Sequence, residues 1–226
     1  MKNIINKKYN QNIKALSKYE RFDFCINKIN FSKKKILDLG CGKGQLYLAL
    51  KKKYKEFNYT GIDFDERLIK EAKSYFPETV FLKKNFIKYK DKNKYDIIVM
   101  WGFLSIFDNY KKILRKVISL NKKKGMISIF SGFNDNDFNT YIRYQKKDGK
   151  KIQSLNIFSI KTIEDFFRKK KYKIILKKKF EINKEIRQSK INPLSSYTIK
   201  KKDGKFITLN SVGVVRNFYH IIIKKI

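Results

Sequence analysis

The sequence is poor in the residues that build disulfides, metal centres and imidazole catalysis. Its 226 residues include two cysteines, one tryptophan and one histidine. The cysteines, Cys25 and Cys41, are too few for a disulfide framework, and neither has a metal-binding neighbour in the sequence. We therefore predict no metal site, and a reducing, cytoplasmic location in which both thiols stay free.

Long apolar runs are also missing. The segment from Met1 to Lys14 mixes charged and apolar side chains, without the continuous apolar core of a signal peptide or a membrane span. We therefore expect a soluble protein with no membrane span. The length of the chain suits one domain with a substantial core.

Acidic residues are few beside the basic ones. The 20 Asp and Glu residues oppose 55 Lys and Arg residues, which gives a formal net charge of +35. Such an excess ordinarily indicates nucleic acid or an anionic membrane as a partner. Here, however, lysines spread from Lys2 to Lys225 supply most of the charge, and arginine, the better ligand for phosphate and guanine, is scarce. We interpret the excess as a solvated lysine coat, typical of A- and T-rich codon usage, and expect no specific nucleic-acid binding; a phosphate-binding face is the alternative.

A glycine-rich loop follows the apolar pair Ile36-Leu37. Residues 38 to 44 read Asp-Leu-Gly-Cys-Gly-Lys-Gly, an acid and then three alternate glycines at the end of an expected β-strand. Such glycines let a backbone lie against a nucleoside-bearing cofactor. A dinucleotide site would need its third glycine at position 45, where this chain has Gln45. The spacing therefore disfavours NAD.

A second acid ends the next expected strand. The run Gly61-Ile62-Asp63-Phe64-Asp65 places the Asp63 carboxylate about where a nucleoside site needs a ribose partner. Asp65 and Glu66 are interpreted as a helix start, because acids favour the first helical turn.

Together these segments resemble the class I S-adenosylmethionine-dependent methyltransferases, of the small-molecule, bacterial type. The resemblance covers roughly residues 30 to 226 and implies S-adenosylmethionine as the cofactor. It implies cofactor contacts from the loop, from the two strand ends beside it and from the turn that would hold the adenine: Asp38, Gly40, Cys41, Gly42, Gly44, Asp63, Phe64, Asn85, Phe86 and Trp101.

The order of the expected elements predicts the fold. Helices are expected at residues 45–52, 66–76 and 160–170, and strands at 79–82, 95–100, 125–130, 172–180 and 218–223, with a lysine-rich loop before residue 125. Alternating strands and helices favour a doubly wound, Rossmann-like α/β fold with a seven-stranded, mostly parallel sheet, and the resemblance makes the last strand antiparallel. We predict one domain, 1–226, with an N-terminal helical cap at 1–30, a cofactor-binding half at 31–130 and a substrate-side half at 131–226. The turn Asp203-Gly204 predicts a hairpin, inserted at about residues 192–212.

The antiparallel last strand would begin at the rim where ligands bind in sheets of this kind. His220, the only histidine, is therefore a candidate general base. A packed, structural histidine is the competing interpretation. Aromatic residues near the expected rim are candidates for the acceptor pocket: Phe103, Phe133, Tyr141, Tyr144 and Tyr219.

The acceptor is expected to be a small molecule. Enzymes of the family that methylate amino groups of bases carry an Asn/Asp-Pro-Pro-aromatic motif after the fourth strand, where this chain reads Met100-Trp101-Gly102-Phe103. We therefore predict transfer to a hydroxyl or carboxyl oxygen, by a monomer or homodimer, in surface-sugar or secondary metabolism. Two alternatives remain: an rRNA or tRNA methyltransferase, and a non-catalytic, cofactor-binding partner subunit.

Overall fold

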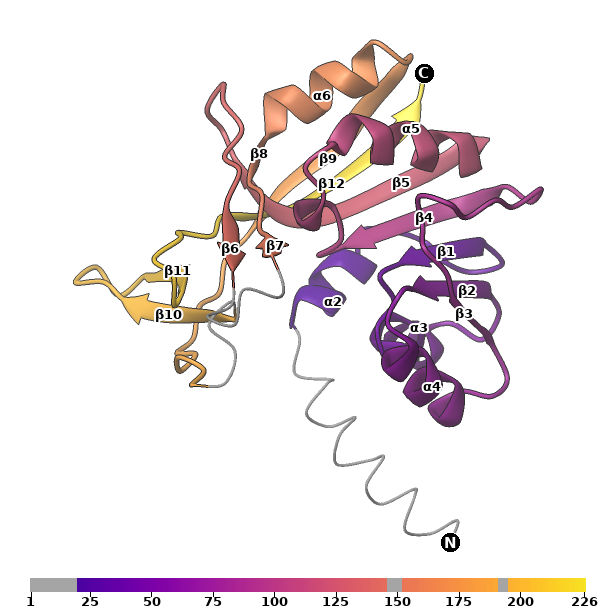
Figure 1. Ribbon diagram of the computed structural model, residues 1–226, viewed down its shortest axis with the longest axis horizontal. Helices are drawn as coiled ribbons and strands as arrows, with labels where there is room; N and C mark the ends of the chain where they lie inside the picture. The colour runs from indigo at the N-terminus through magenta and orange to yellow at the C-terminus, as the bar shows by residue number, and fades with distance from the viewer. Residues whose placement is uncertain (1–19, 146–151, 191–194) are drawn as a thin grey trace, which may run out of the picture. The chain divides into compact units, whose positions relative to one another are not determined.

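The structure is a computed structural model that describes residues 20–145, 152–190 and 195–226 (Figure 1). Most of the expected N-terminal cap and the first residues of the expected insertion lie outside these described residues. The chain forms two compact units. The first unit extends through Phe103 and includes Tyr110–Ser128, whereas the second holds Leu104–Asn109 and Ile129–Lys224.

The first unit alternates strands and helices along the chain. Its elements are α2 Glu20–Ile26, β1 Lys35–Leu39, α3 Gln45–Lys53, β2 Asn58–Asp63, α4 Glu66–Tyr75, β3 Val80–Lys83, β4 Tyr95–Trp101, α5 Tyr110–Leu120 and the first part of β5 Asn121–Asn134. Strand β1 pairs in parallel with both β2 and β4, and β2 pairs in parallel with β3. The side chains of Ile36 and Leu37 on β1 are fully buried, as a central strand requires.

The second unit is richer in short strands. It contains the end of β5, the 3₁₀ turn η1 Leu104–Ile106, β6 Arg143–Gln145, β7 Ile152–Ser154, β8 Phe158–Ser159, α6 Ile160–Arg168, β9 Tyr172–Phe180, β10 Ser196–Lys200, β11 Phe206–Asn210 and β12 Phe218–Lys225. Strands β10 and β11 pair antiparallel, from Ser196 opposite Asn210 to Lys200 opposite Phe206. The hairpin predicted from Asp203-Gly204 is therefore confirmed, with Gly204 at a φ of 80° in its turn.

The strand order confirms the predicted fold class. It runs β3-β2-β1-β4-β5-β12-β9, with the short β8 added against β5. The sheet is mostly parallel and its last strands are antiparallel. This is a doubly wound, Rossmann-like α/β arrangement.

Two local predictions meet different outcomes. Asp65 is the N-cap of α4, because its carboxylate accepts the backbone N–H of Arg67 at 2.9 Å, as expected for a helix start. The lysine-rich loop predicted before residue 125 is wrong: β5 begins at Asn121 and includes all three lysines. All three are exposed at the start of the strand, where Lys122 binds Asp96 across 2.8 Å.

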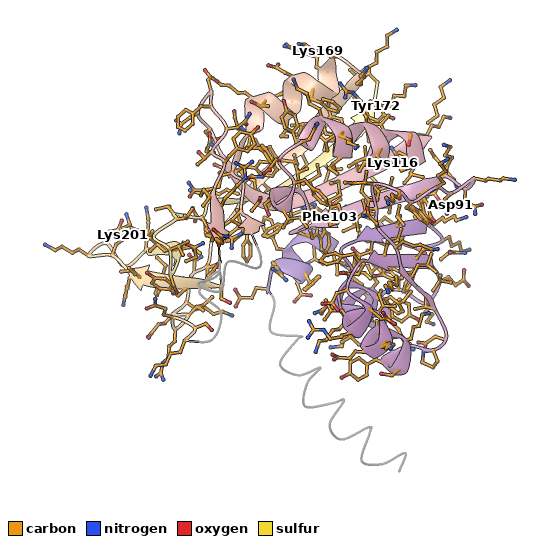
Figure 2. The ribbon with its side chains drawn as sticks, viewed as in Figure 1. Asp91, Phe103, Lys116, Lys169, Tyr172 and Lys201 are labelled. Carbon is orange, nitrogen blue, oxygen red and sulfur yellow. The ribbon has the colours of Figure 1, made fainter. Side chains whose placement is uncertain are left out.

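Strand β9 stands last in the described strand order. Lys173, Lys177, Lys178 and Lys179 on it are all exposed, and Ile175 is 44% exposed. Elsewhere the lysines also face outward: Lys169 and Lys201 are exposed and extend away from the ribbon in Figure 2. Within the described ranges, no helix combines the length and apolar character needed to cross a membrane.

Candidate cofactor-binding site

Backbone hydrogen bonds to β2 hold the glycine loop between β1 and α3. The N–H groups of Gly40 and Cys41 both donate to the Ile62 carbonyl on β2, at 2.8 and 3.1 Å. Gly40 has a φ of 75°, and a Cβ added there would lie 2.8 Å from Cδ2 of Phe103. Both the left-handed backbone and the close ring therefore require glycine at this position.

The third glycine of the loop begins α3. Gly44 is the N-cap residue, with a φ of 83°, and an added Cβ would lie 2.8 Å from Cζ of Phe81. Gly40 and Gly44 are thus fixed by close packing against aromatic rings, whereas a Cβ at Gly42 would lie 3.1 Å from Oε1 of Gln45.

Asp63 ties the loop to the end of β2. One carboxylate oxygen accepts the N–H of Gly42 at 3.0 Å, and the other accepts the N–H of Asp65 at 3.0 Å. The side chain is partly exposed. A carboxylate held in this way, beside a glycine loop at the carboxyl ends of parallel strands, can accept further hydrogen bonds from a ligand.

Asp38, the acid that precedes the first glycine, is buried. It is 5% exposed, and the hydroxyl of Tyr59 donates to its Oδ2 at 2.5 Å. Burial raises the pKa of the Asp38 carboxyl to about 7; the Tyr59 hydrogen bond opposes that rise and the nearby charge of Asp63 adds to it. The carboxyl therefore changes charge near neutral pH.

Cys41 lies inside the same loop and is 4% exposed. Burial raises the pKa of its thiol far above the ordinary value, and the acids Asp38 and Asp63 raise it further. The thiol is therefore neutral, and its S–H donates to the Gly42 carbonyl at 3.9 Å.

The turn after β3 is built around Asn85. Its side-chain oxygen accepts the N–H of Ile87 at 3.0 Å, which leaves the amide N–H₂ as the group with donor capacity to spare. Phe86 is buried and meets the ring of Phe103 edge-on, with centroids 5.6 Å apart. Phe64, directly after Asp63, is 66% exposed and so presents a free aromatic face.

Trp101 ends β4. Its indole N–H donates to Oγ of Ser128 at 2.8 Å, and its ring centroid lies 5.7 Å from that of Phe22 on α2. Hydrogen bonds and ring contacts thus connect many of the sequence-predicted cofactor residues in the first unit, and their role in binding stays a prediction.

Tyr59 is a residue that the sequence reasoning missed. Its alternation with Gly61 and Asp63 on β2 places these three residues on one face of the strand. This shared strand face was the only indication in the sequence, because a tyrosine in a strand is ordinarily interpreted as a core residue.

The candidate acceptor residues other than Phe103 belong to the second unit, and they differ in how far they are exposed to solvent. Phe133 is buried at 1% exposure, whereas Tyr141 is 47% exposed and meets the Phe158 ring edge-on. Tyr219 is 8% exposed, and its hydroxyl donates to the Asp135 carboxylate. Burial and that carboxylate raise the pKa of Tyr219 to about 12.

The two remaining candidates in this unit, His220 and Tyr144, are shielded from solvent to different degrees. His220, on β12, is 0% exposed. Tyr144, on β6, is partly buried, and burial raises the pKa of its hydroxyl. Their roles as base and as acceptor contact stay predictions.

The sequence profile of a family described as "Methyltransferase domain" matches residues 5–176. A protein of Invertebrate iridescent virus 6 that is named as a methyltransferase is 27% identical over 156 residues, which cover 66% of this chain and 58% of that protein. The trans-aconitate 2-methyltransferase of Enterobacter sp. (strain 638) is 28% identical over 94 residues, 42% of this chain and 37% of the enzyme. The chain therefore spans less than two thirds of these relatives.

A solved structure has the same fold. It is a SAM-dependent methyltransferase from Methanosarcina mazei, with a TM-score of 0.61 and 16% sequence identity, and the alignment covers 88% of this chain and 95% of that one.

Proposed function

Because this chain belongs to the methyltransferase domain family, we propose that it transfers the methyl group of S-adenosylmethionine to an oxygen atom of a small molecule. One observation carries the proposal. The Asp63 carboxylate is fixed by the N–H of Gly42 at the mouth of a loop with three left-handed glycines. A nucleoside with a ribose diol and no phosphate fits that arrangement better than a dinucleotide does.

The residues of the first unit divide the cofactor among them in this proposal. Asp63 accepts hydrogen bonds from the ribose hydroxyls, the exposed ring of Phe64 stacks on the adenine, and the second lone pair of the Asn85 side-chain oxygen accepts from the adenine amino group. The glycine loop and Asp38 take the methionine part. The sulfonium supplies its own leaving group when bound, so the chain has to supply orientation and exclusion of water.

The acceptor is proposed to carry a hydroxyl or a carboxyl group. The motif used for amino groups of bases is missing after β4, and distant relatives are named for a small carboxylic acid, trans-aconitate. We propose a monomer or homodimer that acts on a small metabolite of bacterial type, and a carboxylate-bearing acceptor is the first to try.

Titration calorimetry with S-adenosylmethionine tests the cofactor assignment. The variant Asp63→Ala should weaken binding by about 100-fold or more, because two charge-assisted hydrogen bonds are each worth roughly 1.5–3 kcal/mol. Asp137→Ala is the matched control, since Asp137 is an exposed acid of the second unit that pairs with Lys161 at 2.8 Å. Equal affinity of the wild-type protein and Asp63→Ala would contradict the assignment.

Acceptor chemistry needs a separate assay. Small carboxylic acids and sugars are incubated with the protein and methyl-labelled S-adenosylmethionine, and products are identified by mass spectrometry. Base-labile methyl esters indicate a carboxyl acceptor, and base-stable ethers a hydroxyl acceptor. Label that enters only an amine or a nucleic acid would refute the oxygen assignment.

A further inference from the structure

The buried hydroxyl of Tyr59 donates a hydrogen bond to the Asp38 carboxylate. The residue is 3% exposed, and its ring is enclosed by Tyr47 and Phe81, with centroids 5.3 and 5.7 Å away. Among the described residues, Tyr59 is the only recorded hydrogen-bond donor to the Asp38 side chain. The packing of the ring thus fixes the hydroxyl against one oxygen of the buried acid.

We propose that Tyr59 is a positioning residue for the cofactor, whose hydroxyl holds Asp38 as the carboxylate that receives the ammonium group of S-adenosylmethionine. This inference rests on the function proposed above. It adds a residue outside the glycine loop and predicts that cofactor affinity depends on pH.

The choice of Asp38 follows from what the neighbouring acids already bind. Asp63 accepts two backbone N–H groups, one on each oxygen. Glu71, on α4, is paired with Lys43 of the loop at 2.6 Å. Asp38 receives one recorded hydrogen bond, on Oδ2, and a buried carboxylate with a second oxygen to offer is the natural partner of a cation.

The groups around Asp38 shift the pKa of its carboxyl in opposite directions. Desolvation and the charge of Asp63 disfavour the carboxylate, whereas the Tyr59 hydrogen bond favours it. Tyr47 lies beside Tyr59 and carries no charge at neutral pH. Since the pKa of Asp38 is about 7, lowering the pH below 7 protonates the group that would bind the ammonium. Affinity should therefore rise as the pH approaches 7, until the ammonium group of the ligand begins to lose its own proton at higher pH.

Calorimetry between about pH 6 and 8.5 tests this with Tyr59→Phe, which keeps the ring and removes only the hydroxyl. Wild-type affinity should increase about fivefold from pH 6 to pH 7, because a carboxyl with a pKa of about 7 is roughly one-tenth ionised at the first pH and half ionised at the second. In Tyr59→Phe the carboxyl loses a favourable hydrogen bond, so the midpoint should rise by about one unit or more. The variant should then bind about tenfold more weakly than wild type near pH 7, and recover most of that loss at pH 8.5.

A matched control exists in the same unit. Tyr95 is also buried, and its hydroxyl donates to the Asp91 carboxylate at 2.6 Å, apart from the glycine loop. Tyr95→Phe should leave the pH profile of cofactor affinity unchanged. 5′-Methylthioadenosine, which lacks the amino-acid part, should bind wild type and Tyr59→Phe equally at every pH.

The outcomes separate the two proposals. If wild-type protein binds S-adenosylmethionine at no pH, the proposed function fails. If it binds but Tyr59→Phe changes nothing, or weakens S-adenosylmethionine and 5′-methylthioadenosine by the same factor at every pH, Tyr59 is merely part of the core and the inference is wrong. Thermal melts of each variant establish that the comparison is between folded proteins.

Discussion

The two compact units differ in what holds their candidate residues. In the first unit the cofactor candidates come from one stretch, residues 38 to 103, and backbone constraints fix the loop: left-handed glycines, and the N–H of Gly42 on Asp63. In the second unit, side chains distant in the sequence meet, as Tyr219 and Asp135 do across 84 positions. Backbone constraints produce a recognisable spacing of glycines and acids in the sequence. Side-chain contacts between segments that are far apart in the sequence produce no such pattern.

The largest expected effect compares one glycine from each unit. Gly40→Ala and Gly204→Ala both place a Cβ on left-handed backbone, at φ values of 75° and 80°. The Cβ at Gly40 would also collide with the Phe103 ring, whereas nothing lies within 4 Å of one at Gly204. We expect Gly204→Ala to cost about 1–2 kcal/mol of unfolding free energy, and Gly40→Ala several kcal/mol more together with loss of cofactor binding. Equal costs in denaturant titrations would refute the packing argument.

Asp38→Asn should stabilise the protein without cofactor above neutral pH. The folded pKa of Asp38, about 7, lies above its ordinary value of 3.8, so the folded state keeps a proton that the unfolded chain has released. Wild-type unfolding free energy therefore falls, through this group, as pH rises from about 4 to 7, and the loss is complete above 7. The amide variant should escape that loss, which is on the order of a few kcal/mol, measured as the wild-type–variant difference at about pH 5 and 8.

The control for Asp38→Asn comes from the second unit. Asp135 also accepts a tyrosine hydroxyl, but its side chain is 60% exposed. Asp135→Asn should change the unfolding free energy by less than about 1 kcal/mol at either pH. A pH-dependent gain of similar size in both variants would show that burial is not the cause.

His220 tests whether the second unit contributes a base. Its complete burial favours the structural interpretation, so His220→Gln should retain turnover within about fivefold while unfolding free energy falls by about 1–3 kcal/mol. A turnover loss of about 100-fold or more, with unchanged S-adenosylmethionine affinity and a wild-type rate that rises through the imidazole pKa, would instead identify a general base.

The smallest expected effect concerns Asn85. Its oxygen already accepts the N–H of Ile87, a contact that aspartate can also make. Asn85→Asp should therefore change S-adenosylmethionine affinity by less than about threefold. A tenfold loss in calorimetry would show that the amide N–H₂ donates to the cofactor, which would sharpen the assignment of the adenine edge.

The lysine coat offers one more way to separate small-molecule from nucleic-acid chemistry. If charge alone attracts RNA, filter-binding affinity should fall by orders of magnitude between about 50 and 200 mM salt. Selective binding to a structured RNA that persists at the higher salt would favour the rRNA or tRNA alternative.

How far the sequence predicts this molecule depends on the kind of signal. Asp203-Gly204 between alternating runs identifies a hairpin because that turn needs left-handed backbone. The three-residue strands β6 and β7 carry too short a pattern to be recognised. Strand β5 begins with three exposed lysines, and such a charged run carries no apolar alternation that would indicate a strand. The bond from Tyr59 to Asp38 depends on strand register, which the sequence does not encode locally.

The lysines of β9 have a consequence for how copies of this protein meet. A terminal strand presents unpaired N–H and C=O groups to which another chain could add as a further strand, and Ile175 would make such an addition attractive. Lys173 and Lys177–Lys179 oppose it, since docking β9 against β9 would bring two rows of ammonium groups together. The exposed lysines of β9 are thus of the kind that disfavours pairing between the edge strands of two copies.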